Sequence, residues 1–352
     1  MSVQQQAILI IYPCKFLGNL LLALPHFRAI LADQKQVLLV LDERFRELAD
    51  IFLPGEQRIL YYPRSALASG QSPGGRVAAL LGFVGQLRRF QADVLLELEG
   101  ESTSTTLSLL ARAKVKRGPF FTRRKWIFDE LVEFPHLTEH RWLGMQALCG
   151  PCHGQSLQPG YCAPCFSGAS LDAVRRRLKD LGVLPGDRTA ILHVGASQEY
   201  KLWDPKRFAG VIAGLQQRGW QVVLIGAGED DRRQAKRVLQ YRLPAAVVDT
   251  IDQLSFGELA GLMVLGGCFI GNDSGPMHLA AACGLPTLAL FGPTVDRIWA
   301  PLGDNARVVR GIIACHPDCR TITCVQDYLC LKSLGVDAVL KALEEQTAGN
   351  GR

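Results

Sequence analysis

Short apolar runs rich in β-branched residues alternate with helical segments along the first half of this chain. A run that is apolar throughout suits a strand buried on both faces, which is typical of a parallel sheet covered by crossover helices. We therefore predict an α/β fold, with strands at Ala7–Tyr12, Val37–Leu41 and Val94–Leu98, and helices at Gly18–Leu31, Leu80–Phe90 and Ser104–Ala111.

The same alternation starts again in the second half. Two consecutive series predict two doubly wound, Rossmann-like domains. We place their boundary in the segment Cys149–Ser170, rich in Gly, Pro and Cys, which gives domains 1–165 and 166–352 facing a central cleft. The predicted strands are Ala190–Val194, Val222–Ile225, Cys268–Gly271 and Thr287–Phe291, and the helices are Pro205–Leu215, Leu254–Leu265, Met277–Cys283 and Val336–Leu343.

The composition is that of a globular protein with a moderate basic excess. Of 352 residues, 48% are hydrophobic, which excludes a disordered chain, and the net charge of +6 suits an anionic partner. The apolar stretch Ala7–Pro25 contains Pro13 and Lys15, so it is a poor membrane span, and no Lys or Arg precedes it. We expect a cytoplasmic protein that works at the surface of the inner membrane.

The segment Gly271–His278 (GNDSGPMH) lies between a predicted strand and a predicted helix. Asp273 or Ser274 can cap that helix, and Gly275 allows a ligand to approach the backbone. The free N–H groups of the first helical turn, together with the helix dipole, form an anion site. The alternative is a capped helix after an ordinary polar loop, because these are common turn residues.

The sequence resembles glycosyltransferase family 9, the ADP-heptose:lipopolysaccharide heptosyltransferases. The run Gly271–Thr294 (GNDSGPMHLAAACGLPTLALFGPT) resembles their donor-site segment. The run His193–Phe208 (HVGASQEYKLWDPKRF) resembles the family's stretch of Gly-Ala-Ser, then Lys, a Trp and a Pro before a helix. Val223–Glu229, Asp93–Gly100 and Leu17–Pro25 also fall in the family's order. The resemblance covers most of the chain and is stronger in its second half.

The resemblance implies a GT-B fold and an inverting transfer of heptose from ADP-heptose, or a similar nucleotide sugar, to a lipopolysaccharide inner-core hydroxyl or a related one. No metal or cofactor is expected for catalysis. The nucleotide sugar is expected in the C-terminal domain, with Lys201 as the catalytic cation for the leaving diphosphate. Glu229 has the alternative of simply starting a helix, and His278 that of a buried structural residue. The implied donor-binding residues are Ser197, Lys201, Glu229, Asp273, Ser274, Gly275 and His278.

One position departs from the family pattern. The family usually has an Asp after Gly in the first βα loop as the general base, whereas this chain has Asn19 after Gly18, and Asn cannot accept the acceptor's proton. We favour a substitute base among Glu97, Glu99 and Glu101. The alternatives are a different acceptor or donor sugar, a nucleotide-sugar-binding homologue with weak or no catalysis, and an epimerase or hydrolase on the same fold.

A basic run from Arg112 to Lys125 contains no acidic residue. We interpret it as binding an anionic glycolipid acceptor through Arg117, Arg123 and Arg124, together with Gly18 and Asn19; the alternative is a solvated surface. No nucleic-acid-reading motif accompanies the run, so we expect no nucleic-acid partner.

Two CxxC pairs suggest a structural metal, zinc or iron. Cys149 and Cys152 are followed after nine residues by Cys162 and Cys165, a shorter gap than in common zinc sites, and free thiols are the alternative. A second, looser cluster consists of Cys315, Cys319, Cys324 and Cys330.

Overall fold

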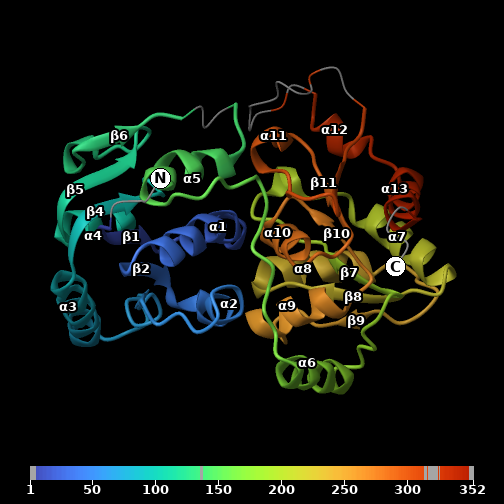
Figure 1. Cartoon of the computed structure of the whole chain (residues 1–352). Helices are drawn as coiled ribbons and strands as arrows, with labels where there is room; N and C mark the ends of the chain where they lie inside the picture. Colours follow the sequence, from blue (N-terminus) through green and yellow to red (C-terminus); the bar gives the residue numbers. More distant parts are fainter. Residues whose placement is uncertain (1–4, 135–137, 313–314, 316–323, 325, 349–352) are drawn as a thin grey trace. The chain divides into compact units, whose positions relative to one another are not determined.

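The computed structural model describes residues 5–134, 138–312, 315, 324 and 326–348. The chain divides into two compact units, Met1–Cys162 and Ala163–Arg352 (Figure 1). Cys319 of the second cysteine cluster lies outside the described residues. Among the helices of the described part, none is long and apolar enough to cross a membrane.

The first unit is built on a six-stranded sheet of parallel strands in the order β3-β2-β1-β4-β5-β6. Its strands are β1 Ala7–Tyr12, β2 Gln36–Asp42, β3 Ile59–Tyr62, β4 Gln91–Glu97, β5 Arg112–Pro119 and β6 Glu130–Val132. Its helices are α1 Leu17–Asp33, α2 Arg46–Phe52, α3 Pro73–Arg89, α4 Ser102–Leu110 and α5 Arg141–Cys149, with 3-10 turns Glu43–Phe45, Lys125–Ile127 and Gly150–Cys152.

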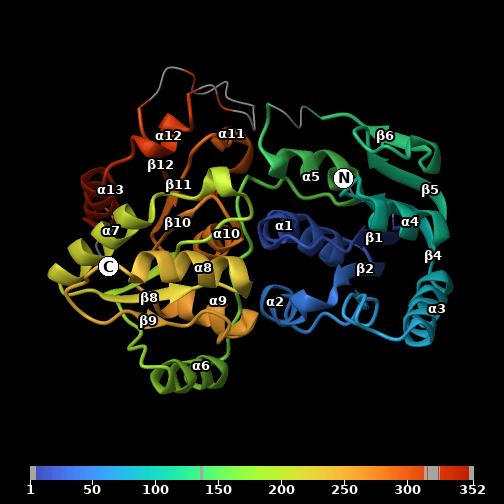
Figure 2. The ribbon, with the colours of Figure 1, turned by 180° about the vertical axis from the view of Figure 1, so that it is seen from behind.

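Helices cover both faces of this sheet, which is why the middle of each central strand is apolar (Figures 1 and 2). Phe83 and Leu87 of α3 and Leu107 of α4 pack on alternate residues of β1 and β4, among them Leu9 and Leu95. Helix α1 packs against α5. All six residues of β1 are buried, as a parallel strand between two helical layers requires.

The second unit repeats this plan, with a parallel sheet in the order β12-β11-β10-β7-β8-β9. Its strands are β7 Thr189–His193, β8 Gln221–Ile225, β9 Val248–Asp249, β10 Cys268–Asn272, β11 Thr287–Leu290 and β12 Ala306–Val309. Its helices are α6 Gly168–Asp180, α7 Pro205–Gln217, α8 Gly228–Leu239, α9 Phe256–Leu265, α10 Gly275–Ala282, α11 Asp296–Trp299, α12 Leu329–Lys332 and α13 Val336–Ala348, with a 3-10 turn at Glu199–Lys201.

The predicted fold class is confirmed: both sheets are doubly wound and parallel. Asp204 caps α7, because its carboxylate accepts hydrogen bonds from the N–H groups of Lys206 and Arg207. The basic run contains a strand that sequence analysis did not predict. Arg112–Pro119 forms β5, in which charged residues leave no continuous apolar run to recognise.

In each sheet the strand order reverses at one point, between β1 and β4 in the first and between β7 and β10 in the second. Connections leave these neighbouring strands in opposite directions, so side chains at their carboxyl ends are left open to a ligand. The residues that follow β1 and β4 are Pro13–Phe16 and Leu98–Glu101, and those that follow β7 and β10 are Val194–Gly195 and Asp273–Ser274.

Asn272 ties the second reversal point together. Its fully buried amide donates hydrogen bonds to the carbonyl oxygens of Val194 (3.0 Å) and Gly195 (3.2 Å). Its Oδ1 accepts from the N–H of Trp203 at 3.1 Å. One side chain therefore fixes the loop after β7 and the start of the segment that leads into α7.

Replacing Asn272 by Ala is expected to lower the free energy of unfolding by about 3 kcal/mol, because it leaves one buried N–H and two buried carbonyls without their partner. Urea denaturation measures the change. Asn305→Ala, which removes an amide that donates to the carbonyls of Ala281 and Leu285, controls for the loss of a buried amide away from the reversal point. Equal stability of Asn272→Ala and the wild type would contradict this role.

Candidate functional site

Ser274 occupies the N-cap position of α10, but its hydroxyl does not cap the helix. It donates a hydrogen bond to the carbonyl of Asn272 at 3.0 Å and lies 2.9 Å from Nδ1 of His193. Gly275 is the first helical residue and Pro276 the second. The first-turn N–H groups therefore lie next to a hydroxyl that helix capping does not use, an arrangement suited to an anion.

His193 and Asp231 complete this cluster, and sequence analysis missed both. His193 ends β7 and is buried, and its Nε2 lies 3.1 Å from Oδ2 of Asp231 on α8. Burial alone would raise the pKa of the Asp231 carboxyl, but His193 and the N–H of Ala227 hold that pKa below its usual value. The sequence predicts that His193 lies near the end of a strand. It gives no sign of Asp231, because only the tertiary fold brings that residue next to His193.

Lys201 and Asp273, both predicted donor-site residues, form an ion pair. Nζ of Lys201 lies 2.8 Å from Oδ2 of Asp273, and both side chains are largely shielded from solvent. The carboxylate of Asp273 thus holds the only cation that the predicted donor set contains. Lys201 is the last residue of a 3-10 turn, and two residues later Asn272 binds the backbone N–H of Trp203. The backbone before and after Lys201 is therefore fixed.

The other predicted donor residues differ in exposure. Ser197 is exposed in the loop after β7, and Glu229 is exposed in the first turn of α8. His278 is buried in α10. Glu229 lies two residues before Asp231 in α8. This position suits a contact to the donor, and it also suits an acidic residue that simply starts the helix, where the helix dipole favours a negative charge.

At the reversal point of the first sheet, Glu99 has the properties of a base. It follows β4, is partly buried, and its pKa is raised to about 7. Burial is the largest cause, and the charges of Glu97 and Glu101 add to it, while a hydrogen bond with the Cys14 thiol and the charge of Arg64 oppose it. A carboxyl with a pKa near neutrality is well matched to taking up and releasing a proton.

The other two predicted substitute bases differ from Glu99. Glu97 is fully buried, and its Oε1 accepts hydrogen bonds from the N–H groups of Glu99 and Gly100, each at 2.8 Å. Glu97 therefore shapes the loop that carries Glu99. Glu101 is exposed at the N-cap of α4, where its carbonyl accepts from Thr105.

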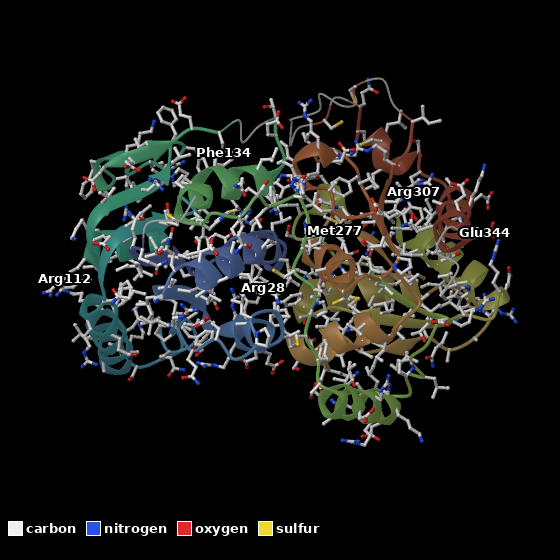
Figure 3. All side chains as sticks on the ribbon, viewed as in Figure 1. Arg28, Arg112, Phe134, Met277, Arg307 and Glu344 are labelled. Carbon is white, nitrogen blue, oxygen red and sulfur yellow. The ribbon has the colours of Figure 1, made fainter. Side chains whose placement is uncertain are left out.

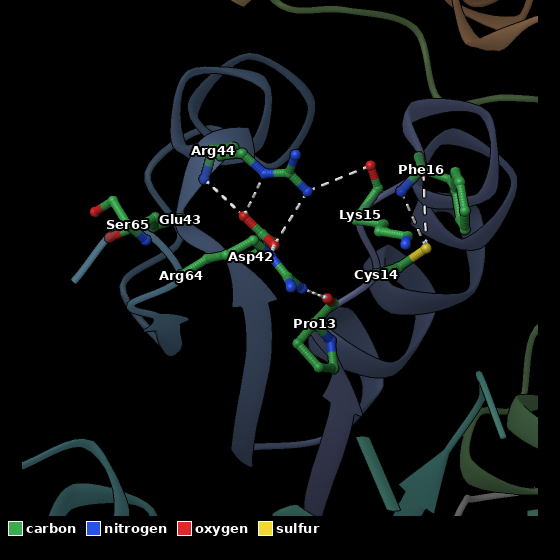
Figure 4. Close-up of polar contacts among 9 residues, drawn as sticks. All are labelled: Pro13, Cys14, Lys15, Phe16, Asp42, Glu43, Arg44, Arg64 and Ser65. Atoms are coloured by element: carbon green, nitrogen blue, oxygen red, sulfur yellow. Dashed lines mark hydrogen bonds and ion pairs between the residues drawn. The ribbon is translucent and has the colours of Figure 1, made fainter. Parts of the chain in front are cut away.

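A charged network holds the loop after β1 (Figure 4). The buried carboxylate of Asp42 pairs with Arg64 and, at 3.0 Å, with Arg44. Arg64 donates on to the carbonyl of Pro13 at 2.8 Å, and Arg44 to that of Lys15 at 3.4 Å. The loop that faces Glu99 through Cys14 is thus fixed from β2 and from the segment after β3.

Gly18 and Asn19 lie in the first turn of α1, directly after this loop. Gly18 is buried and Asn19 is partly buried, with its carbonyl accepting from the Tyr12 hydroxyl at 3.2 Å.

The predicted acceptor arginines are in different environments. Arg117 is 16% exposed and pairs with Glu130 at 2.6 Å, so its charge is already matched. Arg124 donates to Thr106 at 2.7 Å, and Arg123 is exposed. At the start of the basic run, Arg112 extends away from the sheet (Figure 3).

The four cysteines of the CxxC pairs are in different environments. Among the described residues, no three His, Cys, Asp or Glu side chains come together as ligands. Cys152 faces Arg117 at 3.8 Å, Cys162 faces Arg28, and Cys165 is exposed. Burial raises the pKa values of the Cys149 and Cys152 thiols, and the structural zinc or iron suggested by the spacing stays a prediction.

The model of the family described as glycosyltransferase family 9 (heptosyltransferase) matches residues 81–329. The chain belongs to this family. The match begins within α3, includes β4 and the reversal point between β7 and β10, and ends at the start of α12. It confirms the resemblance to the family seen in the sequence.

Relatives and solved structures agree with this membership. Lipopolysaccharide heptosyltransferase 3 of Escherichia coli is 36% identical over 141 residues, which are 40% of this chain and 41% of that protein, so the match spans about two fifths of the curated relative. A glycosyltransferase family 9 structure from Veillonella parvula covers 99% of both chains with a TM-score of 0.79 at 17% identity. The structure of E. coli heptosyltransferase WaaC with ADP-2-deoxy-2-fluoro heptose has a TM-score of 0.67 at 21% identity, and the match covers 96% of this chain and 99% of that chain. These structures support the predicted GT-B fold.

Glu99→Gln is expected to stabilise this family member at alkaline pH. The folded-state pKa of Glu99, about 7, lies above the value of 4.5 expected for an unfolded chain, so folding favours the protonated form. The contribution is full below pH 4.5 and is lost as the pH rises through 7. At pH 8 the variant should gain up to about 3 kcal/mol in free energy of unfolding.

Urea denaturation at pH 4.5 and pH 8 measures this difference. Glu101→Gln, on an exposed side chain two residues away, is the matched control and should keep most of the pH dependence, because burial is the largest cause of the raised pKa of Glu99 and the charge of Glu101 only adds to it. Identical pH profiles for Glu99→Gln and the wild type would show that Glu99 titrates as an ordinary carboxyl.

Proposed function

We propose that this chain transfers a heptose from ADP-heptose to a hydroxyl group of the lipopolysaccharide inner core or a related acceptor, with inversion at the anomeric carbon. Membership of family 9 and the related E. coli lipopolysaccharide heptosyltransferase 3 support the reaction class. The observation that carries the proposal is the Glu99 carboxyl, because a base at this position compensates for Asn19.

In the proposed reaction Glu99 takes the proton of the acceptor hydroxyl. The acceptor oxygen then bonds to the anomeric carbon of the heptose while the bond from that carbon to the β-phosphate oxygen breaks, and ADP leaves with the electron pair. The first unit is assigned to the acceptor and the second to the donor. No metal or cofactor is assigned to the step.

The leaving diphosphate is assigned to Ser274, Gly275 and Lys201. Negative charge grows on ADP as the sugar bond breaks, and donors already fixed in place stabilise that charge without reorganising. Asp273 and Asn272 fix Lys201 and its backbone, as the ion pair and hydrogen bonds above describe. Ser197, Glu229 and His278 stay in the proposal as contacts to the nucleotide and sugar.

The acceptor is proposed to be an anionic glycolipid core, held by Arg123 and Arg124 beside Gly18 and Asn19. Arg117 stays in this set, but we expect its contribution to be smaller, because Glu130 already neutralises its charge. Thr122 links this segment to Glu99, since its hydroxyl approaches the carbonyl of Gly100 at 3.5 Å.

Turnover with ADP-heptose and a heptose-deficient lipopolysaccharide core tests the function. In Glu99→Gln, the rate should fall by about 10²–10⁴-fold, the usual contribution of a general base. In the wild type the rate should fall as the pH drops below 7, because protonated Glu99 accepts no proton. Glu101→Gln is the control and should keep its rate. Released ADP is the measured product.

Three other results would contradict parts of this proposal. Full turnover in all of Glu97→Gln, Glu99→Gln and Glu101→Gln would remove the substitute base. ADP binding without transfer to any core would identify a non-catalytic homologue. Consumption of the nucleotide sugar without an acceptor would identify an epimerase or hydrolase.

Contact with the inner membrane is proposed through α3. The helix exposes Val77, Leu80 and Leu81, of which Leu81 is 66% exposed, and only Phe83 and Leu87 are buried. It contains Arg76, Arg88 and Arg89 and no acidic residue. An exposed apolar edge with only basic charges is typical of a helix that lies on an anionic lipid surface.

Val77→Ser with Leu81→Ser is expected to lower binding to phosphatidylglycerol vesicles at least fivefold in a sedimentation assay, because the variant loses the apolar edge. Leu184→Ser, which alters an equally exposed leucine in the second unit, should leave binding unchanged. Equal binding by all three proteins would contradict the assignment of α3.

A further inference from the structure

A chain of polar side chains leads from Asp231 through His193 to Ser274, and neither His193 nor Asp231 has a role in the transfer described so far. Each ring nitrogen of His193 faces one oxygen: Nδ1 faces Ser274 Oγ at 2.9 Å, and Nε2 faces Asp231 Oδ2 at 3.1 Å. The imidazole is only 4% exposed. Three elements, β7, α8 and α10, each contribute one member.

The backbone around Asp231 is shaped to admit its carboxylate. A Cβ atom on Gly195 would overlap Asp231 Oδ1, and one on Gly226 would lie 2.8 Å from the Asp231 side chain. The N–H of Ala227 donates to Asp231 Oδ2 at 2.9 Å. The two glycines and the N–H of Ala227 therefore hold the carboxylate of Asp231 next to His193. The fold is built to accommodate this contact, unlike an incidental ion pair on the surface.

The hydrogen atoms of the chain can be assigned from its acceptors. An ionised carboxylate only accepts, so Nε2 of His193 carries a hydrogen and donates it to Asp231. The hydroxyl of Ser274 has a single hydrogen, which points to the carbonyl of Asn272 at 3.0 Å. With that hydrogen engaged, Ser274 Oγ accepts, and Nδ1 of His193 is the donor.

A diphosphate beside Ser274 offers this hydroxyl a better acceptor than the Asn272 carbonyl. The hydroxyl can turn its hydrogen to a phosphate oxygen and continue to accept from Nδ1. The imidazole then donates a hydrogen bond from each ring nitrogen, and its positive charge stabilises the phosphate through the Ser274 hydroxyl. Asp231 keeps the ring in this state and orientation, as carboxylates do for hydrogen-bonded histidines.

We infer that Asp231 and His193 are positioning residues that direct the Ser274 hydroxyl to the diphosphate of the donor and support its growing charge. The inference rests on the proposed function, because it needs a diphosphate at Ser274. No bond other than hydrogen bonds changes in this role: His193 keeps both hydrogens, and Ser274 only rotates its own.

Calorimetric titration with ADP and with adenosine tests the inference. Asp231→Asn preserves shape and should weaken ADP binding about tenfold, with adenosine binding changed by less than twofold, because only the phosphates meet Ser274. Asp230→Asn is the matched control: Asp230 is the preceding residue of α8, and its exposed carboxylate pairs with Arg233. It should bind ADP like the wild type.

Two further measurements separate positioning from a structural role. In a Ser274→Ala background, Asp231→Asn should cause no further loss of ADP affinity, since the hydroxyl through which it acts is gone. His193→Asn, which retains one donor toward Ser274, should bind ADP more tightly than His193→Leu. A loss that persists in the Ser274→Ala background, or one that affects adenosine equally, would overturn the relay.

The result distinguishes this inference from the proposed function. If the wild type transfers heptose while Asp231→Asn matches Asp230→Asn in ADP affinity, only the relay fails. If the wild type binds no ADP, the donor assignment fails and the relay falls with it.

Discussion

Burial of both faces of each parallel sheet is the constraint on which this molecule depends. The central strands have no solvated face, so a polar or charged group within them would need a full set of buried partners. Such groups are instead found where strands end. His193, Asn272 and Glu97 are the last residues of β7, β10 and β4, and Asp42 is the last residue of β2. The candidate site is built at these ends.

The residues at the strand ends divide into those that carry chemistry and those that hold them. Asn272 and Glu97 are fully buried and bond to backbone groups, and their neighbours Ser274 and Glu99 are the more accessible groups. For Glu99 this division has a physical reason: a carboxylate that must exchange protons cannot also satisfy the buried N–H groups that Glu97 binds. Partial burial raises the pKa of the Glu99 carboxyl, so the ionised form of Glu99 destabilises the folded protein at high pH.

The sequence predicted the fold and its order of elements well, because buried parallel strands have a strong apolar signal. It failed where that signal is weak: β5 was seen only as a basic run. The CxxC spacing says nothing of the direction in which the thiols point, so the metal that it suggests stays a prediction. Lys201 and Ser274 could be predicted from motifs. Asp231 could not, because its role depends on two glycines in loops that precede it by 36 and 5 residues in the chain.

In the proposed reaction, Glu99 takes the place of the aspartate that the resemblance to family 9 implies in the first βα loop. Strands β1 and β4 are neighbours at the reversal point, so the loops that follow them adjoin, and Glu99 is hydrogen-bonded to Cys14 in the loop after β1. A base at this point can therefore come from either loop. Burial raises the pKa of Glu99 to about 7, so the proposed base is a carboxyl matched to proton uptake, carried by the loop next to the one that precedes Asn19.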